Sequence, residues 1–420
     1  MPSDESENVE DRVAYARMLK DGTLDQCSVT LLVGKAVRAP FVGATAATLV
    51  VSGGLCRATS VAKCNLHCGK NIGKLFFINS LRYYFVEFYE LNNEQRRRLV
   101  DVRQLYEARR AAALEFYHGY RGTMHWRRRA GGEEYLYRIV GKTEHSLGPR
   151  GQKTDGIKAD HDRHREILKG RIATLDGRIR DMARVNRALG IGHVPTIAAR
   201  ILRRLDAAGL LGRHLFVVGT HALFAYEAAA GIVFESGLTA TTDVDLLWDA
   251  RRRLSLALVD VREEGVLGLL RKIDRTFTAQ RGSFRAVNDE GYYVDIIRAP
   301  EKEEMRAVNA KITAADDDIE AATIAGLQWL INVPKFEQIV VGADGRPLWM
   351  SCVDPRAFAL HKYWISQRAD RDPLKRRRDV AQARAVALMA VQYLGLEFDA
   401  KELSALPAHL VQASEALLVP

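Results

Sequence analysis

The chain has 420 residues, of which 47% are hydrophobic and 27% charged, and its formal net charge is +10. This length allows two or three domains with at least one sizeable core, and the composition is ordinary for a globular protein. The basic balance suits polyanionic partners such as nucleotides or RNA, although it is also common in cytoplasmic proteins that bind neither.

The first 75 residues show little pattern. An acidic start, SDESENVED, gives way to a stretch rich in Gly, Ala and Val without helical or strand periodicity. Two interpretations of residues 1–75 stay open, a weakly ordered leader and an over-extended start of translation. The most apolar part, residues 29–55, is interrupted by Lys35, Arg38 and Pro40. These interruptions argue against a membrane span and favour a cytoplasmic protein.

The cysteines also concentrate in this leader. The chain has five, an odd number. Cys64, His67 and Cys68 resemble a fragment of a zinc site, but no second pair of ligands follows at a supporting distance. Free thiols in a reducing cytoplasm are therefore the preferred interpretation.

Residues 76–190 are predicted to form an N-terminal α/β region. Apolar residues at helical spacing predict a helix over 93–117, and the glycines of 119–139 end it before a strand, YLYRIV. Residues 145–156 have the composition of a linker or hairpin. A long exposed helix is expected over 157–188, with a domain boundary near residue 190.

An arginine cluster stands out in this region. Arg127, Arg128 and Arg129 follow Trp126, and Arg121 precedes them. We predict that these arginines face the catalytic cleft and help to hold a polyanionic acceptor. The alternative is a solvated charged face, which is the commoner role of such a run.

The next region, 191–353, contains a strand, a turn and a helix in succession. LFVVG is a short apolar strand, Gly219-Thr220 stands where it stops, and HALFAYEAAA is a helix. A glycine lets the backbone approach a phosphate, and the hydroxyl and free N–H groups at a helix start can bind it. Taken alone this is weak evidence, since many such turns are purely structural.

Three aspartates accompany this turn. Asp243 and Asp245 alternate in the strand TTDVDLLWD and so point to the same face, while Asp295 lies in the strand YYVDII after a hairpin turn. Each alone could be an exposed strand residue. Together, on adjacent strands, they can hold one or two Mg²⁺ ions, because this hard cation prefers oxygen ligands.

At these residues the chain resembles the nucleotidyltransferase-fold superfamily related to DNA polymerase β. The hallmark is a Gly-Ser or Gly-Thr turn, an Asp-x-Asp strand and a later acid. The resemblance implies nucleotidyl transfer from an NTP, with Gly219 and Thr220 at the triphosphate and the three aspartates as metal ligands and catalytic residues. Thr220 replaces the commoner serine but keeps the hydroxyl.

A finer resemblance is to a little-characterised bacterial group of nucleotidyltransferase-fold proteins. In that group, segments similar to GTMHWRRRAGGEEYLYRI and SLGPRGQKT precede the core. The core resemblance covers about residues 200–380, and the wider one about 80–400.

Residues 354–420 are predicted to form a helical C-terminal domain. Asp354-Pro355 is a good start for a helix that carries Lys362, and a second helix is expected to start around Asp379. This layout is similar to abortive-infection-type nucleotidyltransferase toxins, which implies that Lys362 and Asp379 lie near the nucleotide. The alternative is a surface lysine and a capping aspartate. The run from Lys375 to Arg378 is expected to form a basic face.

The expected fold is therefore α+β: a small mixed β-sheet flanked by helices, a helical C-terminal domain and a separate N-terminal α/β region. The leading hypothesis is a Mg²⁺-dependent nucleotidyltransferase with two ions, whose acceptor is an RNA end, a protein or a small molecule. The alternative is a catalytically inactive module of the same fold that binds a nucleotide or RNA.

Overall fold

The computed structural model describes residues 88–251, 259–280, 282–300 and 318–418, and four short strands before them. Those strands form two antiparallel hairpins, β1 with β2 and β3 with β4. Their bounds are Ser28–Leu32, Ala36–Pro40, Ala47–Thr48 and Arg57–Ala58. The possible zinc ligands lie outside the described residues.

Contacts divide the chain into two units, Met1–Glu90 with Leu418–Pro420, and Leu91–Leu417. The boundaries that we expected near residues 190 and 353 therefore fall inside the second unit. Among the described residues, no helix is long and apolar enough to cross a membrane.

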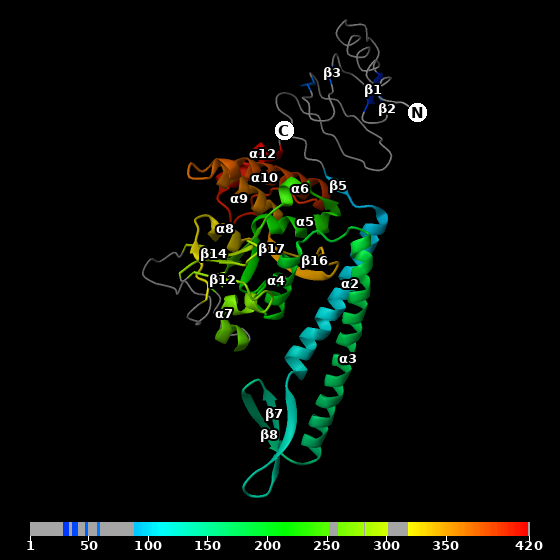
Figure 1. Ribbon diagram of the computed structural model, residues 1–420, viewed down its shortest axis with the longest axis vertical. Helices are drawn as coiled ribbons and strands as arrows, with labels where there is room; N and C mark the ends of the chain where they lie inside the picture. The colour runs from blue at the N-terminus through cyan, green and yellow to red at the C-terminus, as the bar shows by residue number, and fades with distance from the viewer. Residues whose placement is uncertain are drawn as a thin grey trace. The chain divides into compact units, whose positions relative to one another are not determined.

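The second unit begins with what we call the arm, two long helices joined by a small sheet (Figure 1). Its elements are α2 (Asn93–Glu115), a short π-helix (Phe116–Tyr120), β6 (Thr123–Arg128), β7 (Glu134–Val140), β8 (Thr143–Pro149) and α3 (Gln152–Ala188). Asn92 caps α2 by accepting from the Gln95 amide at 2.9 Å. The predicted helices and the YLYRIV strand are present, whereas TMHWRR, which we had not assigned, is the strand β6.

The arm is anchored to the rest of the unit at one end of α3. The Asn186 side chain donates to the Gly345 carbonyl at 2.8 Å. Gly345 has a φ of +77°, and a Cβ there would meet the Ala183 carbonyl oxygen at 2.1 Å. The close approach of α3 therefore depends on a glycine at this position.

The remaining strands form one eight-stranded mixed sheet, the central sheet, in the order β12-β13-β14-β11-β9-β17-β16 with β15 beside β14. It is larger than the small sheet that we expected. Its strands are β9 (Leu215–Val218), β11 (Asp243–Trp248), β12 (Thr278–Ala279), β13 (Arg285–Val287), β14 (Tyr293–Arg298), β15 (Ala322–Thr323), β16 (Lys335–Val341) and β17 (Pro347–Val353). All residues of β9 and β17 are buried, as expected for strands in the middle of a core.

Helices and two short strands complete the described chain, in agreement with an α+β class. They are α4 (Thr196–Ala207), the 3₁₀ turn η2 (Gly219–His221), α5 (Ala222–Ala230), α6 (Ser236–Thr239), α7 (Val259–Arg271), α8 (Leu327–Asn332), α9 (Pro355–Gln367), α10 (Pro373–Leu394), α11 (Ala408–Gln412), α12 (Ser414–Leu418), β5 (Tyr89–Glu90) and β10 (Ile232–Val233).

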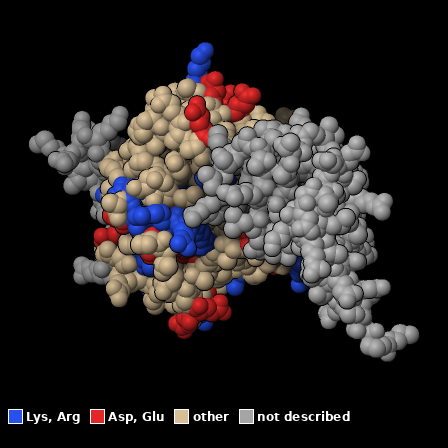
Figure 2. Space-filling model, turned by 90° about the horizontal axis from the view of Figure 1, so that it is seen from above, with Lys and Arg blue, Asp and Glu red and all other residues tan. Residues whose placement is uncertain are grey.

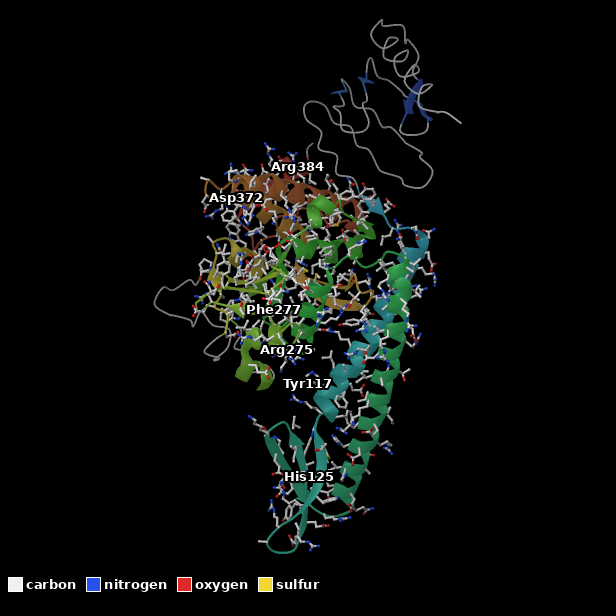
Figure 3. All side chains as sticks on the ribbon, viewed as in Figure 1. Tyr117, His125, Arg275, Phe277, Asp372 and Arg384 are labelled. Atoms are coloured by element: carbon white, nitrogen blue, oxygen red, sulfur yellow. The ribbon has the colours of Figure 1, made fainter. Side chains whose placement is uncertain are left out.

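The C-terminal helices α9 and α10 pack against each other, and α10 also contacts α5 and α6. The expected start of the second helix around Asp379 is wrong. The helix begins at Pro373, where Asp372 caps it by accepting from the Leu374 amide at 2.9 Å (Figure 3). Asp379 lies inside the helix and is buried, so it is not a capping residue.

Candidate active site

Two neighbouring strands bring the three predicted aspartates together. β11 and β14 run parallel, and their register places Asp245 directly beside Asp295. Asp243 lies two residues before Asp245 and so projects from the same side of the strand. One ligand oxygen from each carboxylate lies within 4.8 Å of the other two. This spacing allows oxygens from all three carboxylates to surround one divalent cation.

The cluster is electrostatically strained without a cation. Burial is the largest effect on Asp245, followed by repulsion from Asp243, and together they raise its pKa to about 7. Asp295 acts in the same direction, whereas the charges of Lys362 and Lys375 lower the pKa. Negative charge at this point is therefore not balanced by the surrounding protein.

Asp295 has a partner that the sequence did not lead us to expect. Both of its oxygens accept from Arg285, at 2.7 Å from Nε and 2.5 Å from Nη2. Arg285 lies directly across from Asp295 on β13, and its guanidinium stacks on Tyr293 at 4.6 Å. This bidentate pair fixes the orientation of the third carboxylate.

The Gly219-Thr220 turn lies against the same aspartates. β9 pairs with β11 so that Val218, the last residue of β9, is opposite Asp245. Gly219 follows with a φ of +65°, and a Cβ there would meet Asp245 Oδ2 at 2.2 Å. The Thr220 hydroxyl accepts from the Gln382 amide of α10 at 3.2 Å. The turn is thus held between the aspartate strand and a C-terminal helix.

A buried histidine follows the Gly219-Thr220 turn. His221 is fully buried, and burial lowers its pKa to about 4, so this side chain is neutral. Its Nε2 lies 3.1 Å from the Tyr292 hydroxyl. Burial and the charge of Asp243 raise the pKa of Tyr292, which therefore keeps its proton. Our sequence analysis missed both residues, although each is adjacent to a predicted site residue or strand.

Lys362 and Asp379 are paired with each other. Lys362 Nζ lies 2.9 Å from Asp379 Oδ1, and Arg371 binds the other oxygen at 2.6 Å. Asp379 is almost completely buried between these two cations. Because the Lys362 charge lowers the pKa of Asp245, this lysine lies within electrostatic range of the aspartate cluster.

Further basic residues accompany α9 and α10. Arg378 donates to the carbonyl groups of Leu238 and Ala240, which precede the aspartate strand. Figure 2 shows Lys and Arg side chains gathered in one patch on the face of the molecule seen from above Figure 1. Such a patch can attract a polyphosphate to this face.

The arginines predicted to face the catalytic cleft belong to the arm. Thr154 of α3 contacts the arm sheet, whereas Asn186 contacts the rest of the unit, and the helix between them is about 50 Å long at 1.5 Å per residue. In Figure 3, His125 of the arm sheet lies well away from Phe277. The contacts described for Arg121, Arg127 and Arg129 all lie within the arm, so a position of these arginines at the catalytic cleft stays a prediction.

Comparison with known proteins agrees with the central part of this picture. A family model described as nucleotidyltransferase matches residues 196–407, half of the chain. No curated protein and no solved structure matches the chain. The matched span includes the Gly219 turn, the three aspartates, Lys362 and Asp379, and it leaves out the arm.

Proposed function

The chain belongs to the nucleotidyltransferase family, and from this membership and the geometry of its carboxylates we propose that it is a Mg²⁺-dependent enzyme that transfers a nucleoside monophosphate group from an NTP to a hydroxyl acceptor. The observation that carries the proposal is the convergence of Asp243, Asp245 and Asp295 within 4.8 Å. A structural role for three adjacent carboxylates is hard to reconcile with the repulsion that raises the pKa of Asp245.

The donor set fits a hard divalent cation. All three groups offer carboxylate oxygens, which Mg²⁺ prefers, and no softer sulfur or imidazole ligand belongs to the cluster in the described part of the chain. Asp243 and Asp245 would hold one ion or two, and Asp295 would complete the site. When bound, the metal would stabilise negative charge on the phosphate oxygens and lower the pKa of the acceptor hydroxyl.

The protein groups around the cluster bind and orient the NTP. Gly219 leaves room for the Asp245 carboxylate and, next to it, for a phosphate close to the backbone. The Thr220 hydroxyl can donate to a phosphate oxygen while it accepts from Gln382. Lys362 supplies positive charge on the side of α9. The acceptor oxygen then forms a bond to the α-phosphorus as the bond to pyrophosphate breaks.

The test is direct labelling. The purified full chain is incubated with each of the four α-labelled NTPs, Mg²⁺, and total cell RNA and protein. We expect one or more NTPs to label an acceptor, and EDTA to abolish the labelling. Absence of label with every NTP, in Mg²⁺ or in Mn²⁺, would count against the proposal.

One observation favours the non-catalytic alternative. Both oxygens of Asp295 already accept from Arg285. The guanidinium therefore supplies positive charge to Asp295 at the place where a metal ion would otherwise do so. If Arg285 replaces a metal, the wild-type protein should not bind Mn²⁺ and Arg285→Gln should gain binding. If the protein is an enzyme, the wild type should bind Mn²⁺ in the presence of NTP, and Asp295→Asn should weaken that binding. Calorimetric titration of the wild type and both variants with Mn²⁺, with and without NTP, decides between the enzyme and the non-catalytic module.

A further inference from the structure

The three-stranded sheet of the arm has one covered face and one open face. Side chains alternate along each strand, and Leu136, in the middle of β7, is completely buried. Strands β6 and β8 both contact α3, and Thr154 of α3 packs near Gly148. The face that carries Leu136 is therefore covered by the helix. The neighbouring residues Tyr135 and Tyr137 belong to the opposite face.

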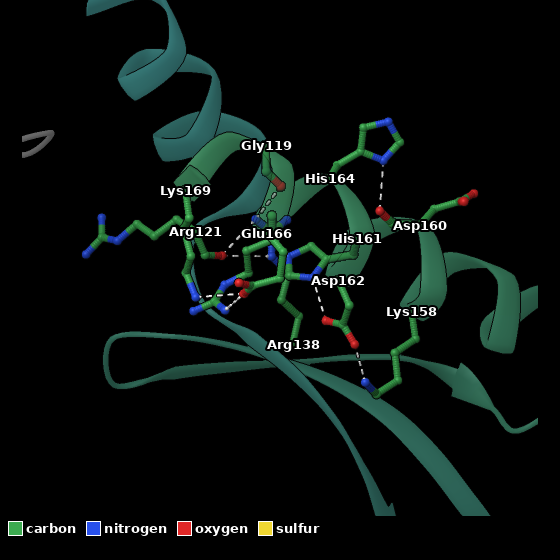
Figure 4. A network of polar contacts seen from close by, with 11 residues as sticks. Gly119, Arg121, Arg138, Lys158, Asp160, His161, Asp162, His164, Glu166 and Lys169 are labelled. Atoms are coloured by element: carbon green, nitrogen blue, oxygen red, sulfur yellow. Dashed lines mark hydrogen bonds and ion pairs between the residues drawn. The ribbon is translucent and has the colours of Figure 1, made fainter. Parts of the chain in front are cut away.

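A network of polar contacts joins this sheet to the neighbouring helical parts of the arm (Figure 4). Arg138 of β7 donates to the carbonyl groups of Gly119 and Arg121, at 2.8 and 3.0 Å through Nη2. Tyr120 stacks on His164 of α3 with ring centroids 5.4 Å apart. Arg138 thus ties β7 to the end of the π-helix, and the π-helix packs in turn on α3.

The open face combines aromatic rings with guanidinium groups. The register pairs His125 with Tyr137 and Arg127 with Tyr135. The Arg129 guanidinium lies 3.8 Å from the centroid of the Tyr135 ring, and that of Arg127 lies 5.2 Å from the Tyr137 ring. Flat aromatic rings stack with nucleobases, and guanidinium groups both stack on bases and bind phosphates.

The charge of this segment is complementary to a nucleic acid. Residues 121–150 contain seven Lys and Arg and only three acidic residues, all Glu. Of these, Arg127 and Arg129 lie over the tyrosine rings of the open face, whereas Arg128 is opposite Glu134 and belongs to the other face. Glu144 pairs with Arg127 at 2.9 Å. A carboxylate at this position repels phosphates but can accept from a ribose 2′-hydroxyl, which DNA lacks.

We propose that the open face of β6–β8 is a binding site for single-stranded RNA, separate from the aspartate cluster. About 50 Å of α3 separates the sheet from the point where the arm meets the central sheet, so the two sites do not share residues. The proposal goes beyond nucleotidyl transfer, because RNA binding on the arm requires neither a metal nor an NTP.

The experiment measures binding of a fluorescent oligouridylate of about 12 nucleotides to the full chain by anisotropy at several salt concentrations. Two variants change the open face: Arg127→Gln with Arg129→Gln, and Tyr135→Leu with Tyr137→Leu. The matched control, Arg163→Gln with Arg171→Gln, removes the same charge from exposed positions of α3. Melting curves establish that each variant is folded.

We expect each open-face variant to bind the RNA about ten-fold or more weakly, and the control to bind like the wild type. Loss of two phosphate contacts should also reduce the slope of log affinity against log salt by about 1.4. Asp245→Asn should bind RNA normally even if it abolishes transfer, which separates this proposal from the enzymatic one.

Four results would overturn the proposal, and the last of them concerns DNA. The first is no measurable binding by the wild type. The second is equal binding by the wild type, the open-face variants and the control. The third has two parts: heparin displaces the RNA at an equal concentration, and the tyrosine variant binds the RNA as tightly as the wild type. Together these results would indicate a surface that binds any polyanion. A single-stranded DNA of the same length that binds more tightly than the RNA would reject RNA as the occupant.

Discussion

The Asp245 carboxylate occupies the space that a side chain at Gly219 would need. A Cβ on Gly219 would lie 2.2 Å from Asp245 Oδ2, and the backbone of Gly219 has a φ of +65°. The absence of a side chain at Gly219 therefore makes room for the Asp245 carboxylate, in addition to any approach of a phosphate to the backbone. Our sequence analysis had linked this glycine to the phosphate alone.

Gly219→Ala should abolish nucleotidyl transfer and lower stability, because the methyl group displaces the Asp245 carboxylate. Gly395→Ala is the matched control, since Gly395 also has a φ of +65° and a Cβ there meets nothing within 4 Å. The control should lose about 1 kcal/mol from backbone strain and keep full activity. Melting curves and the transfer assay would contradict this account if both variants behaved alike.

Asp245→Asn should be inactive yet no less stable than the wild type in EDTA, because it relieves repulsion within the cluster. Asp344→Asn provides the contrast. Asp344 accepts from Arg203 at 2.7 and 2.9 Å, and its pKa is lowered. Its neutralisation should cost about 1–3 kcal/mol and leave transfer intact. Retained activity in Asp245→Asn would reject this aspartate as a metal ligand.

The stability of the metal-free protein should fall as pH rises from about 4 to 7. In this window the folded state keeps the Asp245 proton, since the pKa is about 7, whereas the unfolded chain has lost it at about 3.9. The stability gained by Asp245→Asn should therefore grow with pH and level off above pH 7. It should reach a few kcal/mol at most, at about 1.4 kcal/mol per pKa unit. Denaturant titrations in EDTA measure it, and a pH-independent difference would contradict the raised pKa.

Lys362→Ala should weaken NTP binding by about ten-fold, since loss of a charge-assisted contact costs on the order of 1.5 kcal/mol or more. Arg371→Ala is the control: it also removes one cation from Asp379, but Arg371 is not among the charges that act on Asp245. Titration with a non-hydrolysable NTP analogue distinguishes the two. Equal losses in both variants would assign Lys362 to support of Asp379 only.

The carboxylate cluster was accessible to sequence reasoning because strand periodicity determines it. Asp243 and Asp245 had to share a face, and the hairpin turn before Asp295 placed that residue on a strand. The structure brings oxygens of the three carboxylates within 4.8 Å of one another, as that reasoning expected. The α+β class followed from the same alternation of strands and helices.

Other features depend on contacts that no local pattern encodes. Arg285 meets Asp295 only because β13 and β14 pair in one register, and registers between strands are set by tertiary packing. The burial of His221 likewise follows from the strands around it. The start of α10 was different: Asp372-Pro373 repeats the Asp354-Pro355 signal that we used for α9, so local sequence contained the answer.

Because α3 is held near Gly345, a small change of its angle there becomes a large displacement at its other end. The helix is held near Asn186 and carries its sheet about 50 Å away. A tilt of about 5° at the anchored end moves the other end by about 4 Å over that length, which is comparable to the spacing between neighbouring strands of a sheet. A side chain at position 345 would meet the Ala183 carbonyl, so either α3 or the turn that contains residue 345 would have to shift. The glycine at position 345 therefore bears on where the far end of α3, the longest of the described helices, comes to lie.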